Sequence, residues 1–162
     1  MSIRYIDEID LRILSKLVQD SRIPFSRLAR ELGVSESTVY LRIKRLRELG
    51  ILKSFSAIVD LSRLGYEVEA FIKIKVGNQW SPLEVAEALE KISGVMEVYE
   101  VSGDFPILIK VLARNNNELS NIIDSIMKVK GVTDIDVMYV IRKVAAEMYA
   151  RRISLIVEEL LK

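Results

Sequence analysis

The chain has 162 residues, of which half are hydrophobic and 29% are charged, a balance typical of a globular protein with one domain or two small ones. It contains no cysteine and no histidine, which excludes disulfides, thiol or histidine catalysis and most zinc or haem ligation. We therefore expect no cofactor, no bound metal and no enzymatic activity. No apolar run approaches the roughly 18 residues that a membrane span needs, and the charged N-terminus lacks a signal-peptide core, so we expect a cytoplasmic protein without a membrane partner.

Charge is distributed unevenly along the chain. Residues 1–62 carry a net charge of +3, whereas residues 63–162 carry −2. Because phosphate groups attract cationic surfaces, we expect any nucleic-acid-binding surface to lie in the first third of the chain.

Three helices are predicted in this first third. Residues 6–22 have apolar side chains at helical spacing, and a short second helix follows over residues 24–32. Gly33 permits a sharp turn, and Ser35 is a good N-cap for a third helix over residues 36–49. Three helices with a glycine-containing turn before the third predict a helix-turn-helix.

The third helix has two opposite faces. Val39, Ile43 and Leu46 lie on one side of a helical wheel and are expected in the core. The opposite face begins with hydroxyls, carries one aliphatic residue and then becomes basic, as a helix in the DNA major groove requires. The alternative interpretation is an amphipathic helix with a solvated charged face. The predicted DNA contacts are Ser35, Glu36, Ser37, Thr38, Tyr40, Leu41, Arg42, Lys44 and Arg45.

The rest of the chain contains an internal repeat with a shift of 37 residues. "FIKIKV" (71–76) aligns with "LIKVLA" (108–113), and "EVAEALEKISGVMEV" (84–98) aligns with "NIIDSIMKVKGVTDI" (121–135). Each copy has the pattern of a strand, a glycine-ended helix and a second strand. Two such units predict an α+β fold, a ferredoxin-like βαββαβ domain with both helices on one face of an antiparallel sheet. Phe71 and other apolar residues are expected on the opposite face, which a dimer would bury.

We therefore expect four segments in the chain. Residues 1–52 form a helix-turn-helix domain, residues 53–64 a linking strand or hinge, and residues 65–141 a ferredoxin-like effector and oligomerisation domain. Residues 142–162 form a C-terminal helix with one apolar side. This helix packs on its own domain or, alternatively, binds a partner or another copy of the chain.

A polar turn, Ser102-Gly103-Asp104, joins the two repeats. Asp104 can receive an ammonium group, and the backbone at Gly103 can approach a carboxylate closely. A plain hairpin turn is the alternative interpretation. The sequence has no phosphate-binding loop, no paired-carboxylate motif and no metal-ligand spacing.

Together, these parts resemble the Lrp/AsnC family, the feast/famine regulators of bacteria and archaea. The stretches "DEIDLRILSKLVQDSR", "LARELGVSESTVYLRIKRLRELGIL" and "GVMEVYEVSGDFPILI" stand where the family has its characteristic motifs, and the resemblance covers nearly the whole chain. It implies a transcription regulator that binds double-stranded operator DNA sequence-specifically. It also implies dimers that pair through their sheets, higher oligomers of dimers, and modulation of assembly or DNA binding by an amino acid or similar small molecule.

The resemblance further implies an effector site between dimers, where the polar turn of one dimer meets the segment Gly131-Val132-Thr133 of another. The predicted effector residues are Ser102, Gly103, Asp104, Phe105 and Thr133. Pro106 follows Phe105, where many members carry an acidic residue, so we expect a small molecule with an amino group to bind more weakly or with altered selectivity. An architectural DNA-binding protein without effector and an amino-acid-binding enzyme subunit are the alternative functions.

Overall fold

The computed structural model describes residues 6–144, 153, 156–157 and 159–160. The chain divides into two compact units, residues 1–57 with 144–162 and residues 58–143, and each has its own hydrophobic core. No described helix is long and apolar enough to cross a membrane. Most of the C-terminal helix predicted over residues 142–162 lies outside the described residues; those described at positions 153, 156–157 and 159 are helical.

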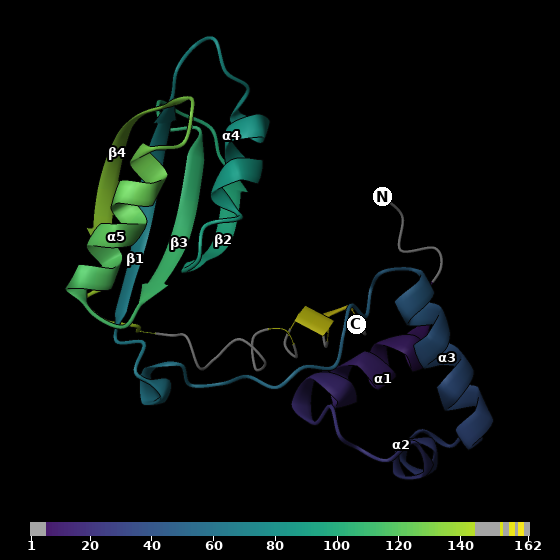
Figure 1. The fold of residues 1–162 in the computed structure, drawn as a ribbon. Helices are drawn as coiled ribbons and strands as arrows, with labels where there is room; N and C mark the ends of the chain where they lie inside the picture. Colours follow the sequence, from purple (N-terminus) through teal and green to yellow (C-terminus); the bar gives the residue numbers. More distant parts are fainter. Residues whose placement is uncertain (1–5, 145–152, 154–155, 158, 161–162) are drawn as a thin grey trace. The chain divides into compact units, whose positions relative to one another are not determined.

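The first unit contains the three predicted helices, α1 (Glu8–Gln19), α2 (Phe25–Leu32) and α3 (Glu36–Glu48) (Figure 1). Gly33 ends α2 with a left-handed φ of 69°, which a residue with a Cβ adopts only at a cost, and this turn leads directly into α3. The unit's core residues include Ile13 and Leu28, which are fully buried between the helices. The helix-turn-helix prediction is therefore confirmed.

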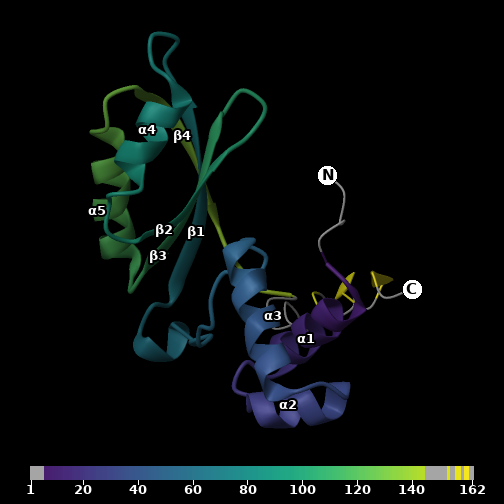
Figure 2. The same cartoon turned by 90° about the vertical axis from the view of Figure 1, so that its right-hand side faces the viewer.

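The second unit is the predicted βαββαβ domain. Its elements are β1 (Val68–Val76), α4 (Pro82–Leu89), β2 (Val95–Glu100), β3 (Ile107–Ala113), α5 (Asn116–Met127) and β4 (Val132–Tyr139). The strands form one antiparallel sheet in the order β2-β3-β1-β4, and Figures 1 and 2 show α4 and α5 on the same face of this sheet. The α+β fold with a ferredoxin-like domain is as the repeat predicts.

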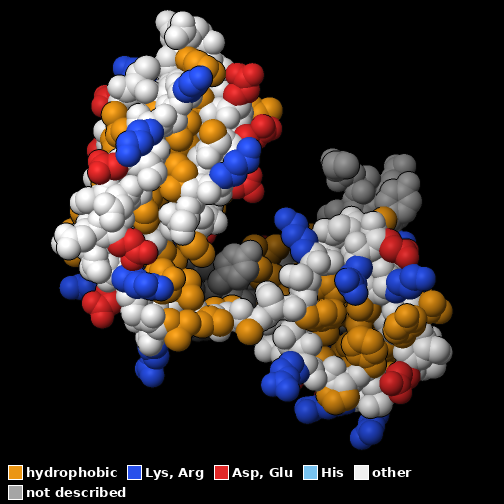
Figure 3. All heavy atoms as spheres, viewed as in Figure 1, with side chains coloured by type: hydrophobic (Ala, Val, Ile, Leu, Met, Phe, Trp, Pro, Cys, Tyr) orange, Lys and Arg blue, Asp and Glu red, His pale blue; other side chains and the backbone are white. Residues whose placement is uncertain are grey.

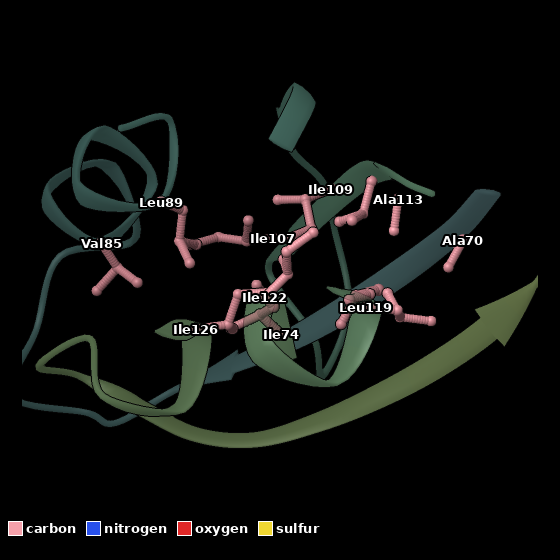
Figure 4. Packing of buried hydrophobic residues seen from close by; sticks show 12 residues of the cluster. Ala70, Ile74, Val85, Leu89, Ile107, Ile109, Ala113, Leu119, Ile122 and Ile126 are labelled. Carbon is pink, nitrogen blue, oxygen red and sulfur yellow. The ribbon is translucent and has the colours of Figure 1, made fainter. Parts of the chain in front are cut away.

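Packing explains why the two repeats align at a 37-residue shift. Ile74, Leu89, Ile107 and Ile126 meet between the helices and the sheet, and all four are fully buried (Figure 4). The glycine that follows the helix of each repeat has a positive φ, and an added Cβ would collide with a side chain of the core. The distances would be 2.4 Å from Ile122 at Gly94 and 2.8 Å from Trp80 at Gly131. Because only glycine fits both the backbone and the space, the same residue recurs in both copies.

The strand predicted in residues 53–64 is not formed within the chain. Residues 53–60 have no helix or strand structure, and the 3₁₀ turn η1 (Ser62–Leu64) follows. A strand needs a neighbouring strand to accept its backbone hydrogen bonds, and among the described residues the four sheet strands pair only with one another. The single chain therefore forms no strand here, whereas the alternative of a linking hinge stays a prediction. The apolar side chains of residues 53–60 lie exposed, Ile58 by 88%.

The sheet face opposite the helices, here called the open face, combines apolar and paired charged side chains. Lys73 forms an ion pair with Asp136, and Lys110 lies 3.4 Å from Glu97 and 3.6 Å from Glu69. The apolar members are Phe71, Tyr99, Leu108 and Met138, of which Tyr99 and Met138 are exposed. Most of the charges on this face are therefore neutralised in place, and the apolar groups lie between them.

Candidate DNA-binding and effector sites

The outward face of α3 is exposed and chemically mixed. Its inner residues Val39, Ile43 and Leu46 are buried in the core, as the wheel predicts. On the other side Tyr40 is 56% and Leu41 62% exposed. Large apolar side chains standing in water gain nothing for the folded unit, so they suit a surface that makes contact with something else.

A cluster of hydroxyls stands at the N-terminus of α3. The Ser35 hydroxyl accepts a hydrogen bond from the backbone N–H of Thr38 at 3.1 Å, which confirms its predicted role as N-cap. The same hydroxyl lies 2.8 Å from the Ser37 Oγ and 2.7 Å from the Thr38 Oγ1. Glu36 is exposed beside them in the first turn. These hydroxyls, at the positive end of the helix dipole, are suited to a phosphate oxygen.

Two cations continue this face toward the C-terminus of α3. The Lys44 side chain is 61% exposed, and its Nζ lies 3.9 Å from a carboxylate oxygen of Glu48 one turn later. The Arg45 side chain is 45% exposed, and its Nη1 lies 3.8 Å from Oδ2 of Asp10. On the face seen in Figure 3, the charged side chains of the helix-turn-helix unit are mostly Lys and Arg, among exposed hydrophobic ones. Both cations can therefore reach a phosphate or a guanine edge.

Arg42 lies differently from the outward-face prediction. Its side chain is only 25% exposed and pairs with Asp7 and with Oδ2 of Asp10, the latter at 3.2 Å. These carboxylates belong to the N-terminal cap of α1, so Arg42 connects α3 to α1. Burial raises the pKa of Asp7, but the hydrogen bond from the Asp10 backbone N–H and the Arg42 guanidinium outweigh it and lower that pKa.

Asp10 is a residue whose importance sequence reasoning missed. It lies in the first turn of α1, where an acidic side chain is ordinary, yet its side chain is 1% exposed. The signal that could have found it is the pair Asp7 and Asp10 at the capping-box spacing, which places two carboxylates at one helix end.

The β2–β3 loop holds four of the five predicted effector residues. The loop closes through a hydrogen bond from the Val101 N–H to the Pro106 carbonyl at 2.8 Å. Gly103 has a φ of 117° with open space around its Cα, and Ser102 and Asp104 are exposed. The structure therefore brings these polar groups to the surface of one turn.

Phe105 attaches this loop to the open face. Its ring is half-buried, and the Nζ of Lys73 lies 5.3 Å from the ring centroid. An ammonium over an aromatic face is an attractive contact, and Lys73 also pairs with Asp136 of β4. The loop is thus coupled to the sheet surface through one lysine.

Thr133, the fifth predicted effector residue, lies elsewhere. Its hydroxyl donates to the Lys75 carbonyl at 3.2 Å, and the residue lines a hollow that residues 75–79 complete. None of the β2–β3 loop residues lines this hollow. The single chain therefore does not bring Thr133 together with Asp104 in one pocket.

Sequence reasoning missed the polar side chains of this hollow, Lys75, Asn78 and Gln79; the polar "GNQ" after a predicted strand was the available signal.

The described residues contain no cluster of acidic side chains that could hold a metal ion.

Comparison with known families gives two matches along the chain. Residues 6–47 match the AsnC-type helix-turn-helix domain, and residues 69–149 match the Lrp/AsnC ligand binding domain.

Curated relatives and solved structures agree with these matches. The HTH-type transcriptional regulator FL11 of Pyrococcus furiosus is 39% identical over 138 residues, which cover 85% of this chain and 90% of that protein. The AsnC structure from E. coli is 28% identical with a TM-score of 0.81, over 86% of this chain and 94% of that one. A feast or famine regulatory protein from M. tuberculosis, solved with L-methionine, is 25% identical with a TM-score of 0.78, over 85% and 93%. The chain therefore belongs to the Lrp/AsnC family of helix-turn-helix transcriptional regulators.

Proposed function

We propose that this regulator binds operator DNA as a homo-oligomer through the outward face of α3, and that a small molecule with an amino group modulates it through the second unit. The observation that carries the proposal is the exposure of Leu41 between hydroxyls and cations, on a helix whose inner side is fully packed. A single exposed leucine is ordinary on a protein surface, but Leu41 stands beside the exposed Tyr40 and between hydroxyls and cations, a combination that suits a DNA groove.

Each group of this face has a role in the proposed complex. The hydroxyls of Ser37 and Thr38 bind phosphate or a base edge, and Leu41 contacts a thymine methyl group. Lys44 and Arg45 bind phosphate oxygens or guanine. Ser35 shapes the start of the helix, and Glu36 and Tyr40 flank the contact. Arg42 does not face the DNA in this proposal but pairs with Asp7 and Asp10 at the start of α1. We further propose that the protein works in the cytoplasm and catalyses no reaction.

Oligomerisation is proposed from two exposed apolar surfaces. The open face presents Tyr99 and Met138 among ion-paired charges, and a second copy of the same face would bury them. The linking segment presents Phe55 and Ile58 on backbone that has no strand partner in its own chain. An extended segment of this kind can complete a sheet by pairing with another copy. Residues 65–141 therefore form the proposed oligomerisation domain, and dimers associate further.

The effector site is proposed at the β2–β3 loop. Asp104 offers an exposed carboxylate to an ammonium group, Ser102 a hydroxyl and Gly103 an open backbone. Phe105 gives the loop its connection to the sheet, and Thr133 of another dimer completes the site. The L-methionine complex of the M. tuberculosis relative supports an amino acid as the ligand class.

Selection from random duplex DNA tests the proposed function. We expect wild-type protein to enrich a defined site and to bind it at least about 10³-fold more tightly than scrambled duplex at physiological salt. The titration is then repeated with each amino acid added in turn, and at least one amino acid should change the affinity of the protein for the selected duplex. A protein that enriches no site contradicts DNA recognition, whereas a site whose affinity no amino acid changes favours the effector-free architectural alternative.

A further inference from the structure

Asp10 is the one buried charged side chain among the residues that the structure describes. Its Oδ1 is buried without a hydrogen-bond partner, whereas Oδ2 accepts hydrogen bonds from the Asp7 backbone N–H and from Nη1 of Arg42. Burying a carboxylate with an unsatisfied oxygen is costly, although the capping box with Asp7 and the Arg42 guanidinium offset part of this cost. The contacts that Asp10 makes outside its own helix point to a second role for this carboxylate.

The contacts of Oδ2 join α1 to α3. It accepts a hydrogen bond from the Asp7 backbone N–H at 3.2 Å within the capping box, and it faces Nη1 of Arg42 at 3.2 Å and Nη1 of Arg45 at 3.8 Å. Asp7 in turn accepts from the Asp10 backbone N–H at 3.0 Å and pairs with Arg42. One arginine on α3 is thus held by two carboxylates whose own positions are fixed by the cap.

Apolar packing alone leaves the placement of α3 loosely specified. Val39, Ile43 and Leu46 bury one stripe of the helix, but hydrophobic contact is non-directional and tolerates small rotations and shifts. A guanidinium between two carboxylates is directional, because its N–H groups lie in one plane. The ion pair can therefore fix the rotation of α3 and with it the direction of the outward side chains.

We propose that Asp10 and Arg42 form a positioning clamp that sets how α3 meets the bases, so that DNA sequence discrimination depends on two side chains that do not touch the bases. The inference rests on the proposed function and deepens it. Base readout requires several side chains to be correctly placed at once, whereas phosphate binding tolerates displacement. The clamp consequently matters for specific binding and little for non-specific binding.

Conservative variants with matched controls test the clamp. Arg42→Lys keeps the charge but replaces the planar guanidinium, whose Nη1 faces both carboxylates, by an ammonium without a fixed plane, and Asp10→Asn keeps the shape but loses the charge. The controls are Arg47→Lys on the exposed side of the same helix and Glu8→Gln in the exposed first turn of α1. Affinity is measured for the wild-type-selected duplex and for a scrambled duplex at several salt concentrations, well below each variant's unfolding midpoint.

We expect Arg42→Lys and Asp10→Asn each to weaken binding to the selected duplex by about tenfold or more, the scale of one lost base readout. In Arg42→Lys, binding to scrambled duplex and its salt slope should stay at the wild-type level, and the controls should change neither. Asp10→Asn also removes a counter-charge from Arg45, so it is compared through the ratio of its two affinities. Because the two residues act together, the double variant should lose no more than the worse single one. If Asp10→Asn fails to fold, the affinities of Arg42→Lys for the two duplexes still test the clamp.

Other outcomes overturn the clamp. A lower unfolding midpoint with unchanged discrimination shows that the pair only stabilises the domain. A loss of affinity for both duplexes in Arg42→Lys shows that Arg42 contacts the DNA directly and does not act by positioning α3. Wild-type protein that discriminates no sequence overturns the proposed function, and the clamp with it; discrimination in wild type that persists in both variants overturns the clamp alone.

Discussion

Replacing Lys44 by alanine tests whether the outward face of α3 binds the phosphate backbone. Lys44 is 61% exposed and its Nζ lies 3.9 Å from Glu48, a surface pair that contributes at most about 1 kcal/mol, so the folded unit should survive the change. Each lost phosphate contact reduces the slope of log affinity against log salt by about 0.9. From 50 to 200 mM salt, a fourfold change, the variant should therefore lose about 3.5-fold less affinity than wild type.

Fluorescence anisotropy with one labelled duplex at four or more salt concentrations measures this slope. Arg12→Ala is the matched control, because Arg12 is an exposed cation on α1 that pairs with Glu8 on its own helix. Its slope should equal that of wild type. If Lys44 contacts guanine instead, the slope should change less and base preference should relax at one position, at a cost of about 1–3 kcal/mol. A Lys44→Ala protein with wild-type slope and wild-type base preference would refute the reasoning.

Three further predictions concern stability, pH and the effector. Gly131→Ala should destabilise the second unit by about 2–5 kcal/mol, because the residue has a φ of 96° and its added Cβ would lie 2.8 Å from Trp80. Gly103→Ala, which has open space around it, should cost about 1–2 kcal/mol, and thermal unfolding measures both. The pKa of Asp7 is lowered in the fold, so its stabilising effect is present above the ordinary aspartate pKa of about 4 and is lost as pH falls through the lowered value; acid unfolding of Asp7→Asn should depend less steeply on pH. Asp104→Ala should abolish the response to an amino-acid effector in calorimetry, since a bound ammonium would lose its counter-charge; an unchanged response would place the site elsewhere.

Local chemistry explains which features the sequence could predict. Ser35 caps α3 and Gly33 turns the chain because each acts through backbone within a few residues. Glycine recurs after the helix of each repeat for a similar reason, since an added Cβ at Gly94 or at Gly131 would collide with a side chain of the core. The outward face of α3, including exposed Leu41, follows from helical periodicity alone.

Features that depend on distant partners could not be predicted in this way. Arg42 lies between the inner and outward faces on a helical wheel, and only its contact with Asp10, 32 residues away, shows which direction it takes. The segment over residues 53–64 has strand-like composition, but a strand forms only where another strand pairs with it. The effector site depends on distant partners as well, because Thr133 and Asp104 are expected to meet only between dimers, and that site stays a prediction.

The most direct test of sequence-specific binding through α3 replaces each thymine of the selected duplex, one at a time, by uracil, which lacks only the methyl group. Removing one buried methyl costs about 0.8 kcal/mol, or about fourfold in affinity. We predict one thymine whose replacement weakens wild-type protein by this amount and leaves Leu41→Ala unaffected, because the methyl group and the leucine contact each other. If every thymine replacement affects wild type and Leu41→Ala equally, Leu41 does not read a thymine methyl group, which contradicts the central contact of the account.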